Sequence, residues 1–130
     1  MNDISNSIDR LYNGLALVEI GGELANVIEW PFNPRDVEFP IIAVEGVNFD
    51  GLINYTNSQS DFSKLTFGIF VFVKTKRDNS TVQKEDKKEM LNIINDIQSK
   101  TYCKYTDIPR MFATVIDSEN VYASYLKGEL

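Results

Sequence analysis

The spacing of apolar residues along the chain predicts two helices. Between residues 3 and 20, apolar side chains recur every three or four positions, and the glycine pair at 21–22 supplies a stop. A second helix is predicted after residue 80, where Ser80 and Gln83 have the spacing of a capping box. Its single apolar stripe consists of Met90, Ile93, Ile94 and Ile97. We expect this helix to be amphipathic, with one buried face and its lysines in water.

Alternating and continuous apolar runs predict the strands. A short extended segment is expected at 27–30, followed by three prolines that keep the chain out of helix. Longer strands are predicted at 41–49 and 65–76, and alternation after residue 110 indicates a C-terminal hairpin with Asp117–Asn120 as its turn. This order predicts an α+β fold, a mixed and mainly antiparallel β-sheet of about four to five strands with an N-terminal helix and a second amphipathic helix packed on it.

The strand at 65–76 is apolar on both faces. One face carries Leu65, Ile69 and Val71, and the other carries Phe70 and Phe72. A single helix can cover only one face of a strand. The face of Phe70 and Phe72 therefore needs the N-terminal helix, a curled sheet or a neighbouring molecule, because monomers rarely leave large apolar patches in water.

The length and composition are those of one globular domain. The chain has 130 residues, of which 43% are hydrophobic and 25% charged, and the polar stretch at about 51–64 is predicted to be a long loop within a single domain, 1–130. No apolar run approaches the roughly 20 residues that span a bilayer, and the start of the chain lacks the pattern of a signal peptide. We expect a soluble protein that is made in the cytosol and has no membrane partner.

Charge is distributed unevenly between the two halves of the chain. Residues 1–63 carry ten acidic and two basic side chains, residues 64–130 carry nine and eleven, and the net charge is −6. An accessible nucleic-acid-binding surface is normally basic, because much of the affinity comes from neutralising phosphates. The charge therefore disfavours nucleic-acid recognition and is typical of an acidic, solvated surface.

The residue types that most catalytic and metal sites need are missing or dispersed. Cys103 is the single cysteine and there is no histidine, which rules out an intramolecular disulfide and a Cys/His zinc cluster and removes the usual general base. No spacing pairs two carboxylates for acid–base catalysis, and no glycine-rich phosphate loop occurs. We expect no enzymatic activity, no cofactor and no metal.

The whole pattern resembles a known family. An N-terminal helix, a "WP" turn, a strand beginning "FPIIAVEG", a polar loop, the strand "LTFGIFVFVKTK", the helix "VQKEDKKEMLNIINDIQSK" and a final hairpin together resemble the tail terminator, or tail-completion, proteins of long-tailed bacteriophages. The resemblance covers most of the chain and is one of element order and hydrophobic pattern. The proline-containing link at 31–40 departs from that pattern, which leaves related neck, head–tail joining and head-completion proteins open.

The resemblance implies a structural virion protein. It implies a homo-oligomeric ring, expected to be a hexamer, that terminates the tail tube and joins it to the head. Its partners would be the tail tube protein and the head-connector or neck protein. DNA would pass through the ring without specific binding, and the ring would be assembled in the host cytoplasm and located in the tail or neck of the virion. The candidate subunit-interface residues are Phe70, Phe72, Phe112 and Tyr122. The candidate assembly-loop residues are Asn57, Ser58, Gln59, Ser60 and Asp61.

Two other functions stay open. The first is a small adaptor or accessory protein-binding domain that acts through sheet-edge or helix contacts. Its docking element would be the C-terminal hairpin, and removing residues 118–130 is then expected to abolish binding and leave the rest folded. The second is a hydrolase that uses carboxylates and a metal, which substitution of those carboxylates would test.

Overall fold

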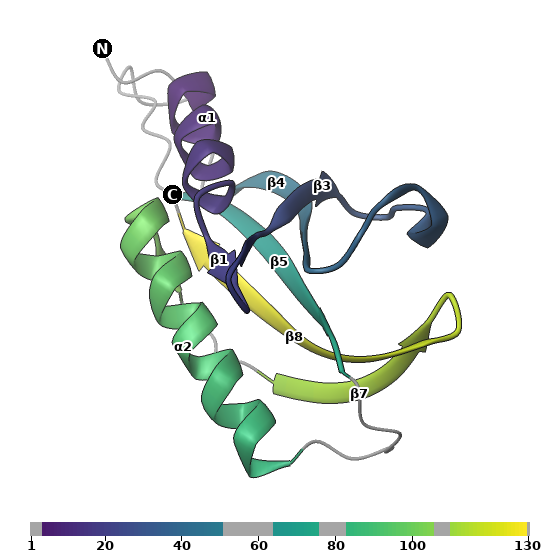
Figure 1. Cartoon of the computed structure of the whole chain (residues 1–130). Coiled ribbons are helices and arrows are strands. Elements are labelled where there is room, and N and C mark those ends of the chain that lie inside the picture. The colour runs from purple at the N-terminus through teal and green to yellow at the C-terminus, as the bar shows by residue number, and fades with distance from the viewer. Residues whose placement is uncertain (1–3, 51–63, 76–82, 106–109, 130) are drawn as a thin grey trace, which may run out of the picture.

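The computed structural model describes residues 4–50, 64–75, 83–105 and 110–129 (Figure 1). The predicted assembly loop lies outside these ranges, as does the rest of the polar stretch at 51–64 except Lys64. In chain order the elements are α1 (Ile4–Leu15), β1 (Glu19–Ile20), β2 (Glu23–Leu24), β3 (Asn26–Glu29), a 3₁₀ turn (Pro34–Asp36), β4 (Ile41–Asp50), β5 (Lys64–Lys74), α2 (Lys84–Thr101), β6 (Lys104–Tyr105), β7 (Arg110–Ile116) and β8 (Glu119–Glu129).

Six of these strands form one sheet in the order β3-β4-β5-β8, with β6 and β7 both paired to the outer edge of β8. Neighbouring strands are antiparallel except β3 and β4, which are parallel. Strands β1 and β2 make a separate hairpin. The α+β class and the mainly antiparallel sheet are as predicted. The strand count is higher than four to five, because β1, β2 and β6 span only two residues each and leave no periodic pattern.

Both helices cover the same face of the sheet (Figure 1). Leu11 and Leu15 of α1 share one buried cluster with the predicted apolar stripe of α2 and with Ile69 and Val71 of β5. The stripe is therefore confirmed as the buried side of α2. Because α1 lies on this face too, it is not what covers Phe70 and Phe72 on the other side.

The two helices approach each other most closely at Gly14. A Cβ at this position would lie 2.5 Å from the carbonyl oxygen of Lys100 and 3.0 Å from the Cα of Thr101, both backbone atoms of α2. Side chains can move aside, but the backbone of a packed helix cannot do so cheaply. Glycine is the residue that allows this contact.

The first helix ends earlier than predicted. α1 stops at Leu15, where the N–H groups of Leu17 and Val18 donate to the carbonyls of Gly14 and Leu15 in a tighter turn. The apolar residues that follow have the two-residue spacing of a strand. Val18, just before β1, and Ile20 within β1 are both buried. The glycine pair at 21–22, with positive φ of 62° and 83°, makes the turn between β1 and β2 and does not end the helix.

The ends of α2 are held by its own flanking residues. Gln83 is the N-cap, and its N–H donates to Oδ2 of buried Asp86 at 3.0 Å. Ser80 of the predicted capping box lies outside the described residues. At the other end Tyr102 takes a left-handed conformation, with φ of 57°, and its N–H donates to the carbonyl of Gln98.

The C-terminal hairpin forms as predicted, but its turn is shorter. Asp117 and Ser118 alone make the turn, and both have positive φ, 48° and 65°. Two-residue turns of this kind match the twist of antiparallel strands. Glu119 and Asn120, expected in the turn, already belong to β8.

Candidate functional site: the aromatic face of the sheet

The sheet face opposite the helices is covered by the link between β3 and β4. Within this link, Phe32, Val37 and Phe39 are half-buried and pack on the sheet. The buried sheet residues beneath them are Ile41, Ala43, Phe72, Val121 and Ala123. We call this side of the sheet the aromatic face. Its cover comes from a link of the same chain, which the prediction of a helix, a curled sheet or a neighbouring molecule did not include.

Trp30 lies at the centre of an aromatic cluster on this face. Its ring centroid is 4.4 Å from that of Phe70, 5.7 Å from that of Phe32 and 6.0 Å from that of Phe72. Phe70 in turn lies 4.6 Å from Tyr125. Aromatic pairs at such distances contribute about 0.5–1.5 kcal/mol each beyond the burial of their area. Trp30 keeps 40% of its surface exposed, so the cluster is open to contact on one side.

A hydrogen bond ties the two neighbours of β5 together beside this cluster. The Tyr125 hydroxyl of β8 donates to Oε2 of Glu45 of β4 at 2.5 Å. The bond passes over Gly68, which the register places directly opposite Glu45. A Cβ at Gly68 would lie 2.7 Å from Oε2 of Glu45 and would also meet the Tyr125 hydroxyl. The absence of a side chain at Gly68 therefore allows the contact between β4 and β8.

Three of the four aromatic residues predicted at a subunit interface lie on the aromatic face, since the register places Phe112 and Phe72 on either side of Ala123 and Phe70 packs in the same cluster. Phe72 is buried on the aromatic face, and Tyr122 is buried on the opposite, helix-covered face. Phe70 is half-buried beneath Trp30. Among the four, Phe112 on the outer strand β7 alone presents substantial surface, with 42% exposed. The predicted assembly-loop residues lie outside the described ranges, and their role stays a prediction.

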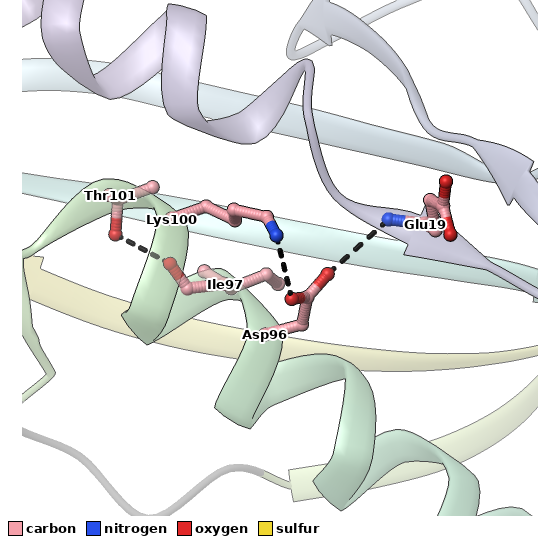
Figure 2. Close-up of polar contacts among 5 residues, drawn as sticks. All are labelled: Glu19, Asp96, Ile97, Lys100 and Thr101. Atoms are coloured by element: carbon pink, nitrogen blue, oxygen red, sulfur yellow. Dashed lines mark hydrogen bonds and ion pairs between the residues drawn. The ribbon is translucent and has the colours of Figure 1, made fainter.

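Polar contacts fix the β1–β2 hairpin to one flank of α2. Figure 2 shows Asp96 between them, with one carboxylate oxygen 3.5 Å from Nζ of Lys100 and the other accepting a 3.3 Å hydrogen bond from the N–H of Glu19. In the next turn Thr101 Oγ1 donates to the carbonyl of Ile97 at 2.8 Å. The hairpin is thereby tied to the helix layer, and its Ile20 also joins the core cluster that contains the sheet residues Ile42 and Val73.

Two hollows lie at the edges of the helix layer. One, of about 250 Å³, runs between α2 and β7, and we call it the α2–β7 groove; its lining residues are Lys87, Met90, Leu91, Ile94 and Met111. The other, of about 460 Å³, lies on the hairpin flank of α2 and mixes apolar Ile20 and Phe39 with charged Glu23, Lys74 and Glu89. The groove is the more apolar of the two in its side chains.

Among the described residues, burial raises the pKa of three groups, Tyr12, Cys103 and Tyr105. Burial raises the pKa of the Cys103 thiol, and it also raises the pKa of the Tyr105 hydroxyl, which lies 3.2 Å from Thr101 Oγ1. A nucleophilic thiol requires the opposite shift, toward the thiolate. Cys103 packs in the core as a small apolar side chain.

Two kinds of feature were not found within residues 4–50, 64–75, 83–105 and 110–129, a cluster of metal ligands and a membrane-spanning helix. No group of three or more potential metal ligands gathers among those residues. No helix in the described part of the chain is long and apolar enough to cross a membrane.

No family model matches the sequence, and no curated protein matches it significantly.

The sequence prediction missed the cover of the aromatic face. Trp30, Phe32 and Phe39 stand in a segment assigned only as an extended, proline-containing link. A signal was present, because three aromatic residues within ten positions are too apolar for a solvated loop. The strand at 65–76 had an apolar face without a partner, and matching the two would have placed the link over it.

Proposed function

We propose that this chain is a ring-forming structural subunit of a bacteriophage virion, a tail terminator or a related neck protein, and not an enzyme. The observation that carries the proposal is the location of the apolar side chains that stay exposed after the chain folds. Both faces of the sheet are covered within the subunit, one by the helices and the other by the β3–β4 link. Apart from Trp30, the large exposed apolar residues in the described part of the chain lie around the β1–β2 hairpin, on and just after α2, and on β7: Leu17, Leu24, Leu91, Tyr102, Phe112 and Val115. Such placement suits lateral contacts between copies.

The element order supports the same proposal. A first helix, a long antiparallel strand pair, a second helix and a closing hairpin follow one another as the resemblance to tail terminators implies. In this role a ring, expected to be a hexamer, closes the tail tube and joins it to the head connector. The acidic side chains of the first half, such as Glu23, Glu29 and Glu38, are exposed. A channel lined by such groups would repel phosphates and let DNA slide without sticking.

The experiment for this function uses the particles themselves. Virions purified from cells that carry the gene are examined by mass spectrometry, and particles from a deletion strain by electron microscopy. We expect the chain in virions at a few copies per particle, and in the deletion strain filled heads beside tails that are not joined to them. A chain absent from purified virions, with normal particles in its absence, would refute the proposal.

A second function is favoured by one observation, the outer edge of β7. Among the described strands β7 pairs with β8 alone, and its Phe112 and Val115 are exposed. An adaptor that adds a partner strand here would lose binding in Val115→Lys, because a charge on an edge strand opposes pairing. Removal of residues 118–130 is not a clean test, since β8 is an interior strand and the expectation that the rest stays folded is wrong.

A further inference from the structure

The two flanks of α2 differ in their charged residues, although on the hairpin flank the charge of Asp96 is offset by its ion pair with Lys100. On the hairpin flank, Glu89 lines the larger hollow and Asp96 contacts β1. On the other flank, Lys87 and the exposed Leu91 line the α2–β7 groove. The buried stripe of the helix separates these two sides.

The α2–β7 groove is apolar at its base and basic at its rim. Met90 and Ile94 form the base, and Leu91 at the rim is 56% exposed. Lys87 lines the groove, and Lys88 follows it on the exposed side of α2. Neither lysine makes an ion pair with any residue that the structure describes. The groove thus offers apolar surface and uncompensated positive charge together.

The β1–β2 hairpin has the complementary composition. Leu24 is 57% exposed, and Leu17 just before β1 is 59% exposed. Glu19, the cross-strand partner of Leu24, and Glu23 beside it are both exposed acidic residues. The hairpin thus presents leucines flanked by carboxylates.

We propose that copies of this chain associate head to tail, with the β1–β2 hairpin of one copy seated in the α2–β7 groove of the next. Leu24 enters the groove against Leu91 and Met111, and Glu19 and Glu23 face Lys87 and Lys88. The complementary charges argue for a second copy as the occupant. Because hairpin and groove are different surfaces on opposite flanks of α2, each copy uses both, and the contact repeats into a closed ring or a filament. The inference rests on the proposed ring function and supplies its lateral interface.

Charge reversal on one surface at a time tests this contact. Glu19→Lys with Glu23→Lys makes the hairpin basic, and Lys87→Glu with Lys88→Glu makes the groove rim acidic. All four side chains are exposed, so the fold is expected to persist in both variants. Sedimentation velocity and native mass spectrometry of the full chain are then used to follow association over a range of concentrations.

We expect each double variant alone to need about tenfold or more protein for half-assembly, because like charges face each other at every contact. An equimolar mixture of the two variants should assemble within about threefold of the wild-type concentration, with the two variants alternating in the oligomer. Raising the salt concentration should bring the half-assembly concentrations of the variants closer to that of the wild type, since screening weakens the repulsion.

An apolar pair of variants provides the second measurement. Leu24→Ser and Leu91→Ser should each weaken association to a similar extent. Tyr102→Asn is the matched control, because Tyr102 is a large exposed side chain outside the contact and asparagine tolerates its left-handed backbone.

Three results would overturn the inference. They are double variants that assemble like the wild type, a mixture that assembles no better than either variant, and a wild-type chain that stays monomeric at millimolar concentration. The ring function is judged separately, by the presence of the chain in virions. A chain found in virions whose charge variants assemble normally would keep the function and refute this interface.

Discussion

We expect Gly14→Ala to lower the free energy of unfolding, whereas helix propensity alone predicts that it would raise it. Gly14 lies in α1, and a glycine-to-alanine change inside a helix normally stabilises it by about 0.8–1 kcal/mol. Here the new Cβ would stand 2.5 Å from the carbonyl oxygen of Lys100 in α2, where an ordinary contact begins at 3.4 Å. The helices must separate by close to that 0.9 Å difference at their point of contact.

The cost of that separation exceeds the gain. Overfilling a packed contact typically costs about 1–3 kcal/mol, and here fully buried Leu11 and Leu15 move with α1 away from the shared core. We expect a net loss of about 1–2 kcal/mol in the free energy of unfolding. The neighbouring change Asn13→Ala, at an exposed position of the same helix, should instead gain about 0.5 kcal/mol.

Urea unfolding followed by Trp30 fluorescence and by circular dichroism measures both variants against the wild type. The prediction is a lower midpoint for Gly14→Ala and a slightly higher one for Asn13→Ala, with unchanged slopes. If Gly14→Ala stabilises the protein as much as Asn13→Ala does, the helices do not meet at this glycine, and the argument for their close packing fails.

Three further changes test the sheet and the core. Gly68→Ala should lower the free energy of unfolding by about 1–2 kcal/mol, because its Cβ collides with the Tyr125 hydroxyl, whereas Gly46→Ala, with no atom within 4 Å, should not lower it; equal effects would contradict the close contact. Ser124→Ala should raise unfolding free energy by about 1 kcal/mol, because the buried Ser124 hydroxyl has no hydrogen-bond partner among the described residues; a loss in urea unfolding would reveal a partner. At pH 8 the Cys103 thiol should react with a disulfide reagent far more slowly in the native state than in urea, since burial raises its pKa and blocks access; equal rates would place it at the surface.

The parts of the fold that sequence reasoning recovered are those with long periodic patterns. β4 and β5 are long apolar runs bounded by polar segments, and α2, of 18 residues, carries one apolar stripe at helical spacing. The hairpin of β7 and β8 was recovered because both strands alternate over several residues on either side of polar positions. The α+β class follows from these elements alone.

The parts that were missed depend on contacts distant in sequence. β1, β2 and β6 are strands only because each pairs with another segment in the folded chain. With two residues each, they are too short to show an alternating sequence pattern. The end of α1 was misjudged because Val18 fits a helical stripe and a strand equally well. Trp30 was missed as the centre of the aromatic cluster, since only the folded chain brings the link over Phe70 and Phe72.

The position of β8 has a consequence for how the protein is made. β5 gains its second neighbour only after residues 119–129 have left the ribosome. Until then the nascent chain holds a strand that is apolar on both faces and has one open edge, the kind of segment that pairs with other chains. The yield of folded protein would therefore depend on how quickly the final strand is synthesised and on chaperone protection of the unfinished sheet until then.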